Sequence, residues 1–286
     1  MMEYLNESSV EAFIKAALAE DIGDGDHSTL ASVPEDAIGK AKLLVKDDGI
    51  IAGIEMAKQI FDYFDPELKV ETLIGDGARV KQGEIAFTVE GKARSILTSE
   101  RLVLNCMQRM SGIATYTSNL NDLISHTNAK LLDTRKTTPN FRICEKWAVV
   151  IGGGKNHRFG LYDMVMLKDN HIDFAGGIHE AISATKNYLH KKGLDLKIEV
   201  ETRNLDEVKQ VLDHEGIYSI LLDNMGPEIL KEAVELINGR TVTEASGGIT
   251  EETITAIAES GVDYISVGAL THSAGSLDLS LKAIDE

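Results

Sequence analysis

Short apolar runs alternate with longer amphipathic stretches through the second half of the chain. The runs are centred on Leu131, Val165, Ile198, Ile220, Val242 and Ile265, at intervals of 33–34 and then 22–23 residues. An interval near 22 residues holds about one strand, one helix and two short loops, so this pattern predicts repeated βα units. The expected helices include residues 205–212, 227–237 and 251–259.

The first half of the chain has a different pattern. Ser8-Ser9-Val10-Glu11 has the form of a capping box and opens an amphipathic helix, and residues 21–29 are expected to form a loop. Residues 40–45 and 75–85 predict short strands joined by tight turns, similar to the hairpins of biotinyl or lipoyl carrier domains but without their modifiable lysine. A long helix or a helix pair, which Ser99 can cap, is expected from Ser99 to about Ile124, at the seam between two domains.

Polar residues follow each of the later apolar runs. They are Asp133–Lys136, Lys168–His171, Glu201, Asp223–Asn224, Ser246–Gly248 and Gly268–Leu270. A βα barrel presents its active site at the carboxyl ends of all its strands, whereas a doubly wound sheet concentrates polar residues at one switch point. The pattern therefore favours a barrel over the doubly wound alternative, although only six strands are evident.

Composition and charge narrow the class of protein. With 286 residues, 43% hydrophobic and 26% charged, the chain is typical of a globular protein rather than a disordered one. Its net charge of −17 disfavours non-specific binding to nucleic acid or anionic membranes. Residues 1–6 lack the basic run of a signal peptide and no long apolar span is present, so we expect a cytoplasmic protein. Cys106 and Cys144 are expected to be buried small side chains.

Positive charge is nevertheless concentrated between residues 133 and 171. The basic residues there are Arg135, Lys136, Arg142, Lys146, Lys155, Arg158 and Lys168. Arginine binds carboxylate and phosphate groups with paired hydrogen bonds, and the glycines at 152–154 allow the backbone before His157 and Arg158 to approach a ligand closely. These features indicate a pocket for a ligand with several negative charges; a solvated basic face is the alternative.

Two acidic residues and two glycine-containing turns complete the candidate chemistry. Glu201 and Asp223 end adjacent predicted strands, where they could hold Mg²⁺, accept hydrogen bonds from a sugar or stabilise a developing cation. Residues 246–248 and 268–270 close the last two strands, where barrels commonly bind phosphate through backbone N–H groups. A P-loop, a dinucleotide-binding glycine motif and the second histidine of a zinc protease motif are absent from the sequence.

The order of these motifs resembles one enzyme family over nearly the whole chain. The motifs are Asp133-Thr134-Arg135-Lys136-Thr137-Thr138-Pro139, Gly152-Gly153-Gly154-Lys155-Asn156-His157-Arg158, Leu167-Lys168-Asp169-Asn170-His171, Glu199-Val200-Glu201, Leu221-Leu222-Asp223-Asn224 and Ser246-Gly247-Gly248. The chain is similar to quinolinate phosphoribosyltransferases, also called nicotinate-nucleotide pyrophosphorylases (carboxylating). It departs from them at Asn140 and Trp147, neither of which matches a catalytic position of the family.

The resemblance implies an N-terminal open-faced α/β sandwich and a C-terminal, incomplete TIM-like α/β barrel of seven strands. We expect the sandwich in residues 1–115, joined by 272–286, and the barrel in 116–271. The implied reaction joins quinolinate to phosphoribosyl pyrophosphate and gives nicotinate mononucleotide, pyrophosphate and CO₂ for NAD biosynthesis. It also implies a Mg²⁺ requirement and a homodimer with shared active sites, which could assemble further.

Residue roles follow from the same motif match. Arg101 from the partner subunit, with Arg135, His157, Arg158 and Lys168, would bind quinolinate. Lys136, Glu201 and Asp223 would be catalytic, the two acids holding the metal directly or through water or substrate. The phosphate would be bound by Ser246, Gly247, Gly248, Gly268, Ala269 and Leu270. Two alternatives are a molybdenum-associated relative with another substrate and a non-catalytic binder of phosphorylated metabolites.

Overall fold

The computed structural model describes residues 4–284 and divides the chain into two compact units. One unit combines the residues up to 118 with 136–153 and those from 269 onward, and the other combines 119–135 with 154–268. Residues 1–3 and 285–286 lie outside the described residues. They belong to the segments expected to form the sandwich, and residues 1–3 also belong to the N-terminal stretch that lacks the basic run of a signal peptide.

The first unit is built on an antiparallel sheet with the strand order β12-β1-β5-β3. Its strands are β1 (Ile38–Val45), β3 (Lys69–Thr72), β5 (Ile85–Lys92) and β12 (Leu279–Ala283), and β2 (Gly49–Ile50) pairs separately with β4 (Arg79–Val80). Its helices are α1 (Glu7–Ile22), α2 (His27–Ser32), α3 (Ile54–Phe64), α4 (Ala93–Ile124, continuing past residue 118), α5 (Arg142–Ile151) and α11 (Ala269–His272). The C-terminal strand β12 thus completes a sheet formed by the N-terminal part of the chain.

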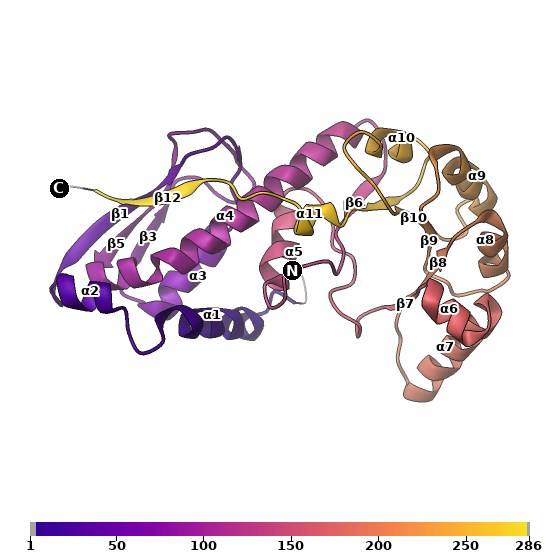
Figure 1. The fold of residues 1–286 in the computed structure, drawn as a ribbon, viewed down its shortest axis with the longest axis horizontal. Helices are drawn as coiled ribbons and strands as arrows, with labels where there is room; N and C mark the ends of the chain where they lie inside the picture. The colour runs from indigo at the N-terminus through magenta and orange to yellow at the C-terminus, as the bar shows by residue number, and fades with distance from the viewer. Residues whose placement is uncertain (1–3, 285–286) are drawn as a thin grey trace. The chain divides into compact units, whose positions relative to one another are not determined.

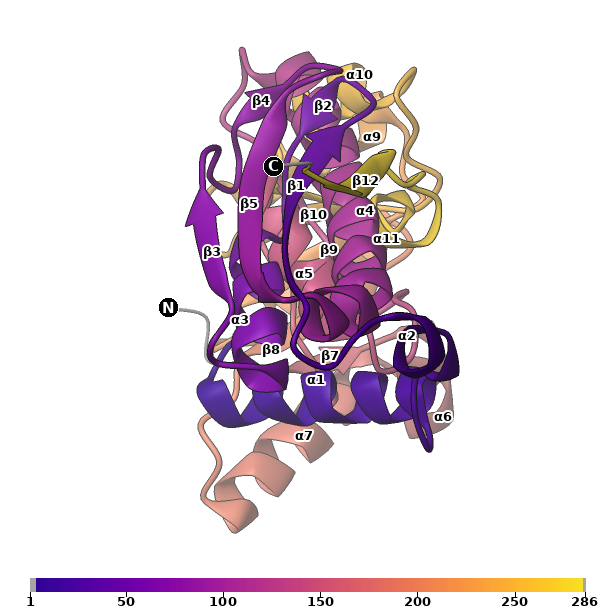
Figure 2. The same cartoon turned by 90° about the vertical axis from the view of Figure 1, so that its left-hand side faces the viewer.

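One face of this sheet is covered by helices α3 and α4 (Figures 1 and 2). Every second residue at the end of β1, namely Ala41, Leu43 and Val45, is buried, as expected for a strand with one face in the core. On the helical side Phe61 of α3 packs edge-to-face on Phe87 of β5, with ring centroids 6.1 Å apart. The unit is therefore an open-faced sandwich.

Three sequence-based expectations at helix starts are wrong. Helix α1 is capped by Asn6, whose Oδ1 accepts a hydrogen bond from Ser9 N at 3.0 Å, rather than by Ser8. Residues 21–29 are only partly a loop, because Asp26 caps the short helix α2. Helix α4 begins at Ala93, directly after β5, so Ser99 lies inside the helix and its Oγ donates to Ser95 O.

The second unit contains a parallel sheet with the strand order β6-β11-β10-β9-β8-β7. The strands are β6 (Lys130–Leu132), β7 (Val165–Leu167), β8 (Ile198–Thr202), β9 (Ser219–Asp223), β10 (Val242–Ser246) and β11 (Tyr264–Ser266). The helices that alternate with them are α6 (Asp169–Ala175), α7 (Ile178–Lys192), α8 (Leu205–Leu212), α9 (Pro227–Ile237) and α10 (Ile254–Ala258). Helices α8 and α9 coincide with the predicted ranges, and α10 is shorter than predicted.

A seventh parallel segment joins this sheet at Lys155. It forms a single bridge with Leu132, in which Lys155 N donates to Leu131 O at 2.9 Å and Asp133 N donates to Lys155 O. Six strands and this bridge make the incomplete seven-stranded barrel that the family resemblance implies, and the fold class is confirmed.

The strand register sorts the side chains of the barrel into two faces. Glu199 is paired with Ser219 and Leu221 with Glu244, so these side chains share one face of the sheet. The intervening residues, such as Val200 and Ile220, are apolar and buried against the surrounding helices. The outer face is thus apolar, while the inner face carries polar side chains, including Glu199 and Glu244, among apolar ones such as Leu221.

Among residues 4–284, the longest helices contain no stretch apolar enough to cross a lipid bilayer.

We predict that Gly112→Ala destabilises the first unit. A Cβ on Gly112 of helix α4 would overlap the carbonyl oxygen of Gly275, which is backbone and cannot move aside locally. Overpacking of this kind costs about 2 kcal/mol, so the urea midpoint of unfolding should fall. Gly75→Ala is the matched control, since a Cβ there has no neighbouring atom within 4 Å; equal midpoints for the two variants would contradict the packing described here.

Candidate active site

Lys168 and Glu201 face each other at the carboxyl ends of neighbouring strands. Strand β7 pairs with β8 so that Met166 lies opposite Glu199, and continuing this register places Lys168 opposite Glu201. Lys168 Nζ lies 3.5 Å from Glu201 Oε2, and the N–H of Asp169 donates to Glu201 Oε1 at 3.3 Å. A cation and a carboxylate from two separate sequence motifs therefore meet at one edge of the barrel.

Asp223 lies at the same edge and on the same face of the sheet as Glu201. Glu201 is opposite Leu221 in the β8–β9 pairing, and Asp223 is two residues farther along β9. Two residues of a strand span roughly 7 Å, so Asp223 projects beyond Glu201 toward the open end of the strands. Its Oδ2 accepts a hydrogen bond from Asn224 Nδ2 at 2.6 Å.

The positive charge of Arg135 acts on Arg158. Burial lowers the pKa of Arg158, and the positive charge of Arg135 lowers it further, against the opposing effect of Glu199 and Asp163. Arg158 is also fixed by a hydrogen bond from its Nη1 to Met164 O at 3.2 Å. An anion bound near Arg158 would offset both its burial and the positive charge of Arg135, so these arginines are suited to binding a carboxylate or phosphate.

The loop that carries His157 and Arg158 is held in place by two aspartates. Buried Asp133 accepts hydrogen bonds from His157 N at 2.9 Å and from Asn156 Nδ2 at 2.6 Å. Asp163 accepts hydrogen bonds from the N–H groups of Phe159 and Gly160. The loop is therefore preorganised, although the sequence alone suggested mainly glycine flexibility.

The side chain of His157 is anchored inside the barrel. Its Nε2 lies 2.9 Å from Glu199 Oε2 and 3.5 Å from Glu244 Oε2. Ser219 Oγ donates to Glu199 Oε1 at 2.8 Å, and Ser266 Oγ donates to Glu244 Oε1. We call these five residues the interior network.

The interior network sets the protonation of its members. Burial disfavours the charged form of His157, but hydrogen bonds to Glu199 and Glu244 outweigh burial and raise the pKa of His157 to about 10. Burial and the neighbouring Glu199 charge raise the pKa of Glu244. Burial would also raise the pKa of Glu199, but hydrogen bonds from His157 and Ser219 outweigh it and lower that pKa. The network therefore favours the ionised form of Glu199 more than that of Glu244.

The other nitrogen of the His157 ring also has a partner. The backbone N–H of Arg158 donates to Nδ1 at 2.8 Å, which requires an unprotonated Nδ1. This contact therefore favours the neutral ring, whereas Glu199 and Glu244 favour the protonated ring. In either protonation state the ring is fixed between the interior network and the backbone of Arg158.

Two groups of side chains could hold a metal ion. Within the described part of the chain, His157, Glu199 and Glu244 are close enough, with candidate ligand atoms within 4.8 Å of one another, but these atoms are already hydrogen-bonded to each other and to serines. Glu201 and Asp223 instead offer two carboxylates at the open strand edge. Mg²⁺ prefers oxygen ligands and commonly takes one or two carboxylates together with substrate phosphates. This second pair fits it better in ligand type, and Glu201 would then share its oxygens between the metal, Lys168 and the Asp169 N–H.

The turn after β10 requires glycine. Gly247 has a φ of +94°, and a Cβ there would overlap the Asn224 side chain, while Asn224 N donates to Ser246 O at 2.8 Å. The Ser246–Gly248 segment therefore brings bare backbone next to the end of β9, where Asp223 lies.

Other predicted residues lie in the first unit. Arg101 is exposed and lies on α4. The chain re-enters the first unit at Lys136 and again at Ala269, so that unit also contains Lys136, Ala269 and Leu270. Arg142 and Lys146 of the basic run lie in α5, and Lys146 is fully buried, so the run does not form a single patch.

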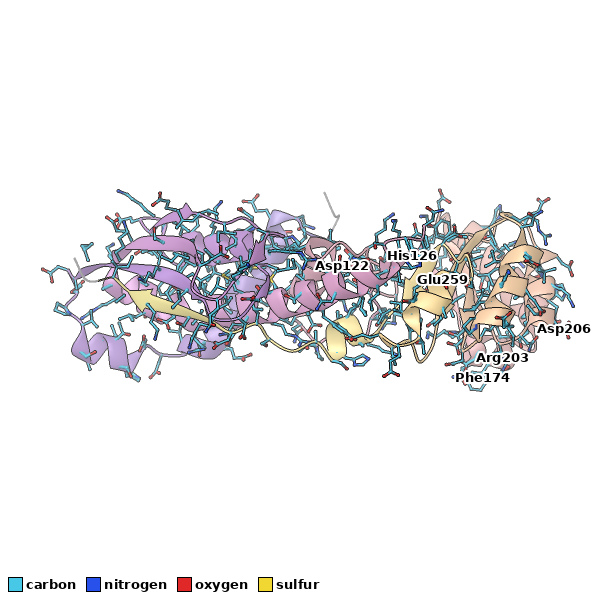
Figure 3. The ribbon with its side chains drawn as sticks, turned by 90° about the horizontal axis from the view of Figure 1, so that it is seen from above. Asp122, His126, Phe174, Arg203, Asp206 and Glu259 are labelled. Atoms are coloured by element: carbon cyan, nitrogen blue, oxygen red, sulfur yellow. The ribbon has the colours of Figure 1, made fainter. Side chains whose placement is uncertain are left out.

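Two histidines outside the site make surface contacts. His126 lies beside Glu259, at 3.0 Å (Figure 3), and His214 is 2.6 Å from His179. Sequence reasoning missed Glu244 as a site residue and included Glu199 only as part of a motif.

Comparison with known proteins identifies relatives along almost the whole chain. Residues 26–111 match the family model "Quinolinate phosphoribosyl transferase, N-terminal domain", and residues 113–282 match the corresponding C-terminal domain.

Two curated plant proteins are about half identical to this chain. The "Nicotinate-nucleotide pyrophosphorylase [carboxylating], chloroplastic" of Arabidopsis thaliana is 50% identical over 288 residues, covering 96% of this chain and 82% of the relative. The "Quinolinate phosphoribosyltransferase [decarboxylating] 2b, mitochondrial" of Nicotiana tabacum is 51% identical, covering 94% and 80%.

A solved structure, NadC from Streptococcus pyogenes, has a similar fold. It superposes with a TM-score of 0.90 at 39% identity, covering 98% of this chain and 99% of that chain.

We predict that Glu199→Ala strongly destabilises the second unit. It removes the carboxylate that pairs with His157 and accepts from Ser219, leaving buried polar groups without that partner. Breaking a buried pair in this way costs about 3 kcal/mol or more, measurable as a loss of unfolding free energy in urea. Asp206→Ala is the control, because Asp206 pairs with Lys209 on the outer surface (Figure 3) and exposed pairs contribute little. Similar losses for both variants would show that the interior network is not specially stabilising.

Proposed function

Because the chain belongs to the quinolinate phosphoribosyltransferase family, we propose that the cations and carboxylates at the barrel's strand ends carry out that family's reaction. Quinolinate and phosphoribosyl pyrophosphate react to give nicotinate mononucleotide, pyrophosphate and CO₂, a step of NAD biosynthesis. The observation that carries the assignment of the site is the meeting of Lys168 with Glu201 at the edge where Asp223 also projects.

Quinolinate binds through its two carboxylates in this proposal. Arg135, Arg158 and Lys168 supply the positive charge, and partial burial of Arg158 strengthens its interaction with an anion. His157 accepts a hydrogen bond from the backbone N–H of Arg158 and so orients that residue toward the substrate. The positive charge of Arg135 acting on Arg158, which a bound dicarboxylate would offset, supports the role of the arginines.

Glu201 and Asp223 act on the ribosyl group. As pyrophosphate leaves, positive charge develops at C1 of the ribose, and carboxylates on that face stabilise it. Lys136 faces the same sugar-phosphate, and the backbone N–H groups of Ser246–Gly248 and Gly268–Leu270 bind the 5′-phosphate. Mg²⁺, held by Glu201 and Asp223 directly or through water or substrate, would neutralise charge on the departing pyrophosphate.

Loss of CO₂ follows from the new bond to the pyridine nitrogen. That nitrogen becomes positively charged, so the ring can accept the electron pair left when the adjacent carbon–carboxylate bond breaks. The same carbon then takes up a proton from water, which gives nicotinate mononucleotide. The cations must bind both carboxylates of quinolinate. They must not stabilise the departing carboxylate in the bound ground state more than they stabilise the transition state for its loss. A mobile lysine such as Lys168, nearly half exposed, is suited to that balance.

The proposal includes a homodimer in which Arg101 of one chain completes the quinolinate site of the other. A cytoplasmic location is also part of it, although the two plant relatives are named as chloroplastic and mitochondrial.

We predict that turnover of quinolinate with phosphoribosyl pyrophosphate requires Mg²⁺ and is lost with EDTA. Glu201→Ala and Asp223→Ala should each lower kcat by about 10²-fold or more, because each removes transition-state charge stabilisation. Product formation is followed as nicotinate mononucleotide. Undiminished turnover in both variants would exclude these carboxylates from catalysis. Turnover of nicotinate but not quinolinate would refute the substrate, and tight binding without product would favour a non-catalytic binder.

We predict that two inactive variants restore each other's activity. Chains with Arg101→Ala are mixed, through unfolding and refolding, with chains carrying Lys168→Ala. Shared sites give hybrid dimers with one intact site, so about a quarter of wild-type activity should return after random pairing. The control mixes Lys168→Ala with Arg135→Ala, which lie in the same unit and should not complement each other. Absence of recovery in the first mixture would mean that Arg101 serves its own chain.

A further inference from the structure

A buried ion pair in the first unit lies outside the proposed chemistry. Arg109 of α4 places Nη2 at 3.1 Å and Nε at 3.2 Å from Glu145 Oε1 of α5. The Glu145 side chain is fully buried, and that of Arg109 is 24% exposed. Buried ion pairs add little net stability compared with apolar packing, so the specific contacts of this pair are the more informative feature.

The pair is hydrogen-bonded to two chain segments that carry predicted site residues. Glu145 accepts hydrogen bonds from Thr138 N at 2.9 Å and from Thr138 Oγ1 at 3.0 Å. Arg109 donates to the carbonyl oxygens of Thr271 and Ala274. Thr271 Oγ1 in turn donates to Lys136 O at 2.8 Å. The contacts form a closed series running from Lys136 through Thr271, Arg109 and Glu145 to Thr138.

The segment that contains Lys136 has no regular secondary structure. It lies between the end of β6 at Leu132 and the start of α5 at Arg142, and Asn140 within it adopts a φ of +62°. Neither a strand ladder nor a helix fixes the backbone there. Side-chain hydrogen bonds from buried Thr271 to Lys136 O, and from Thr138 N to buried Glu145, therefore hold the backbone at Lys136 and just after it.

We propose that Glu145 and Thr271, linked through Arg109, are positioning residues for Lys136. The inference rests on the proposed catalytic role of Lys136. Catalytic groups must be held to within a fraction of an ångström, so slackening this segment lowers the rate of the chemical step. It affects quinolinate binding less, because Arg158 and Lys168 lie on other segments, in the other unit, and only Arg135 adjoins Lys136.

A double-mutant cycle tests this proposal in the full-length protein with Mg²⁺ and both substrates. Glu145→Gln is introduced into the wild type and into Lys136→Ala, and kcat and KM are measured for the folded protein. In the wild type we expect kcat to fall by about tenfold or more, with KM for quinolinate within about twofold. In Lys136→Ala the same change should lower kcat by less than about twofold, because the group that it positions is already absent.

A second pair of variants guards against misfolding of Glu145→Gln. Thr271→Val removes the hydroxyl that donates to Lys136 O and should repeat the pattern, whereas Thr271→Ser keeps the hydroxyl and should restore most of the rate. Glu67→Gln is a control for loss of an ion pair, since Glu67 and Lys92 pair at 2.6 Å on the surface. It should leave kcat unchanged.

Two results would overturn the proposal, and they are distinguishable. Equal rate losses in the wild-type and Lys136→Ala backgrounds would show that Glu145 acts only on the fold, while the role of Lys136 stands. Wild-type kcat in Lys136→Ala alone would remove Lys136 from the proposed function and the positioning role with it.

Discussion

Charge removed from water has to be paired, and this constraint organises the barrel of this protein. A buried carboxylate is stable only with hydrogen-bond donors or a cation beside it. The interior network meets that need for Glu199 and Glu244 with His157 and two serines. Asp133 meets it with the backbone of His157. The same contacts that satisfy these acids therefore fix the loop that carries Arg158.

The balance of acidic and basic side chains differs at the edge of the barrel. Inside, acids outnumber cations around a single histidine, whereas at the strand ends the positive charge of Arg135 acts on Arg158. Lys168 faces Glu201, which is mostly buried. An edge of this composition suits a substrate with two carboxylates next to a sugar-phosphate. The rigid interior thus supplies the support, and the exposed edge supplies the binding surface.

The sequence predicted much of this because the relevant patterns are local or periodic. Apolar runs at intervals of 22–23 residues gave the later strands, and the helices at 205–212 and 227–237 were placed correctly. The Ser99 cap was wrong because β5 runs directly into α4, which depends on the packing of the first unit rather than on residues next to Ser99. The six-strand pattern could not reveal the seventh segment, since that segment pairs through Lys155 alone.

The sequence carries a signal for one member of the interior network. In Ile198-Glu199-Val200-Glu201, the two acids alternate with apolar residues, so they must share one face of a strand. Because Glu201 lies at the carboxyl end of its strand, Glu199, two residues earlier, lies deeper on the same face. Which side chain would pair with it could not be predicted, because His157 comes from a loop about 40 residues earlier whose course is set by Asp133.

A crystal structure of this protein with quinolinate alone tests the central claim most directly, since quinolinate without the phosphoribosyl donor has no reaction partner. The account predicts both carboxylates within about 3 Å of nitrogen atoms from Arg135, Arg158 and Lys168, with His157 still bonded to Glu199. Quinolinate bound elsewhere, or these three side chains turned away from it, would contradict the account.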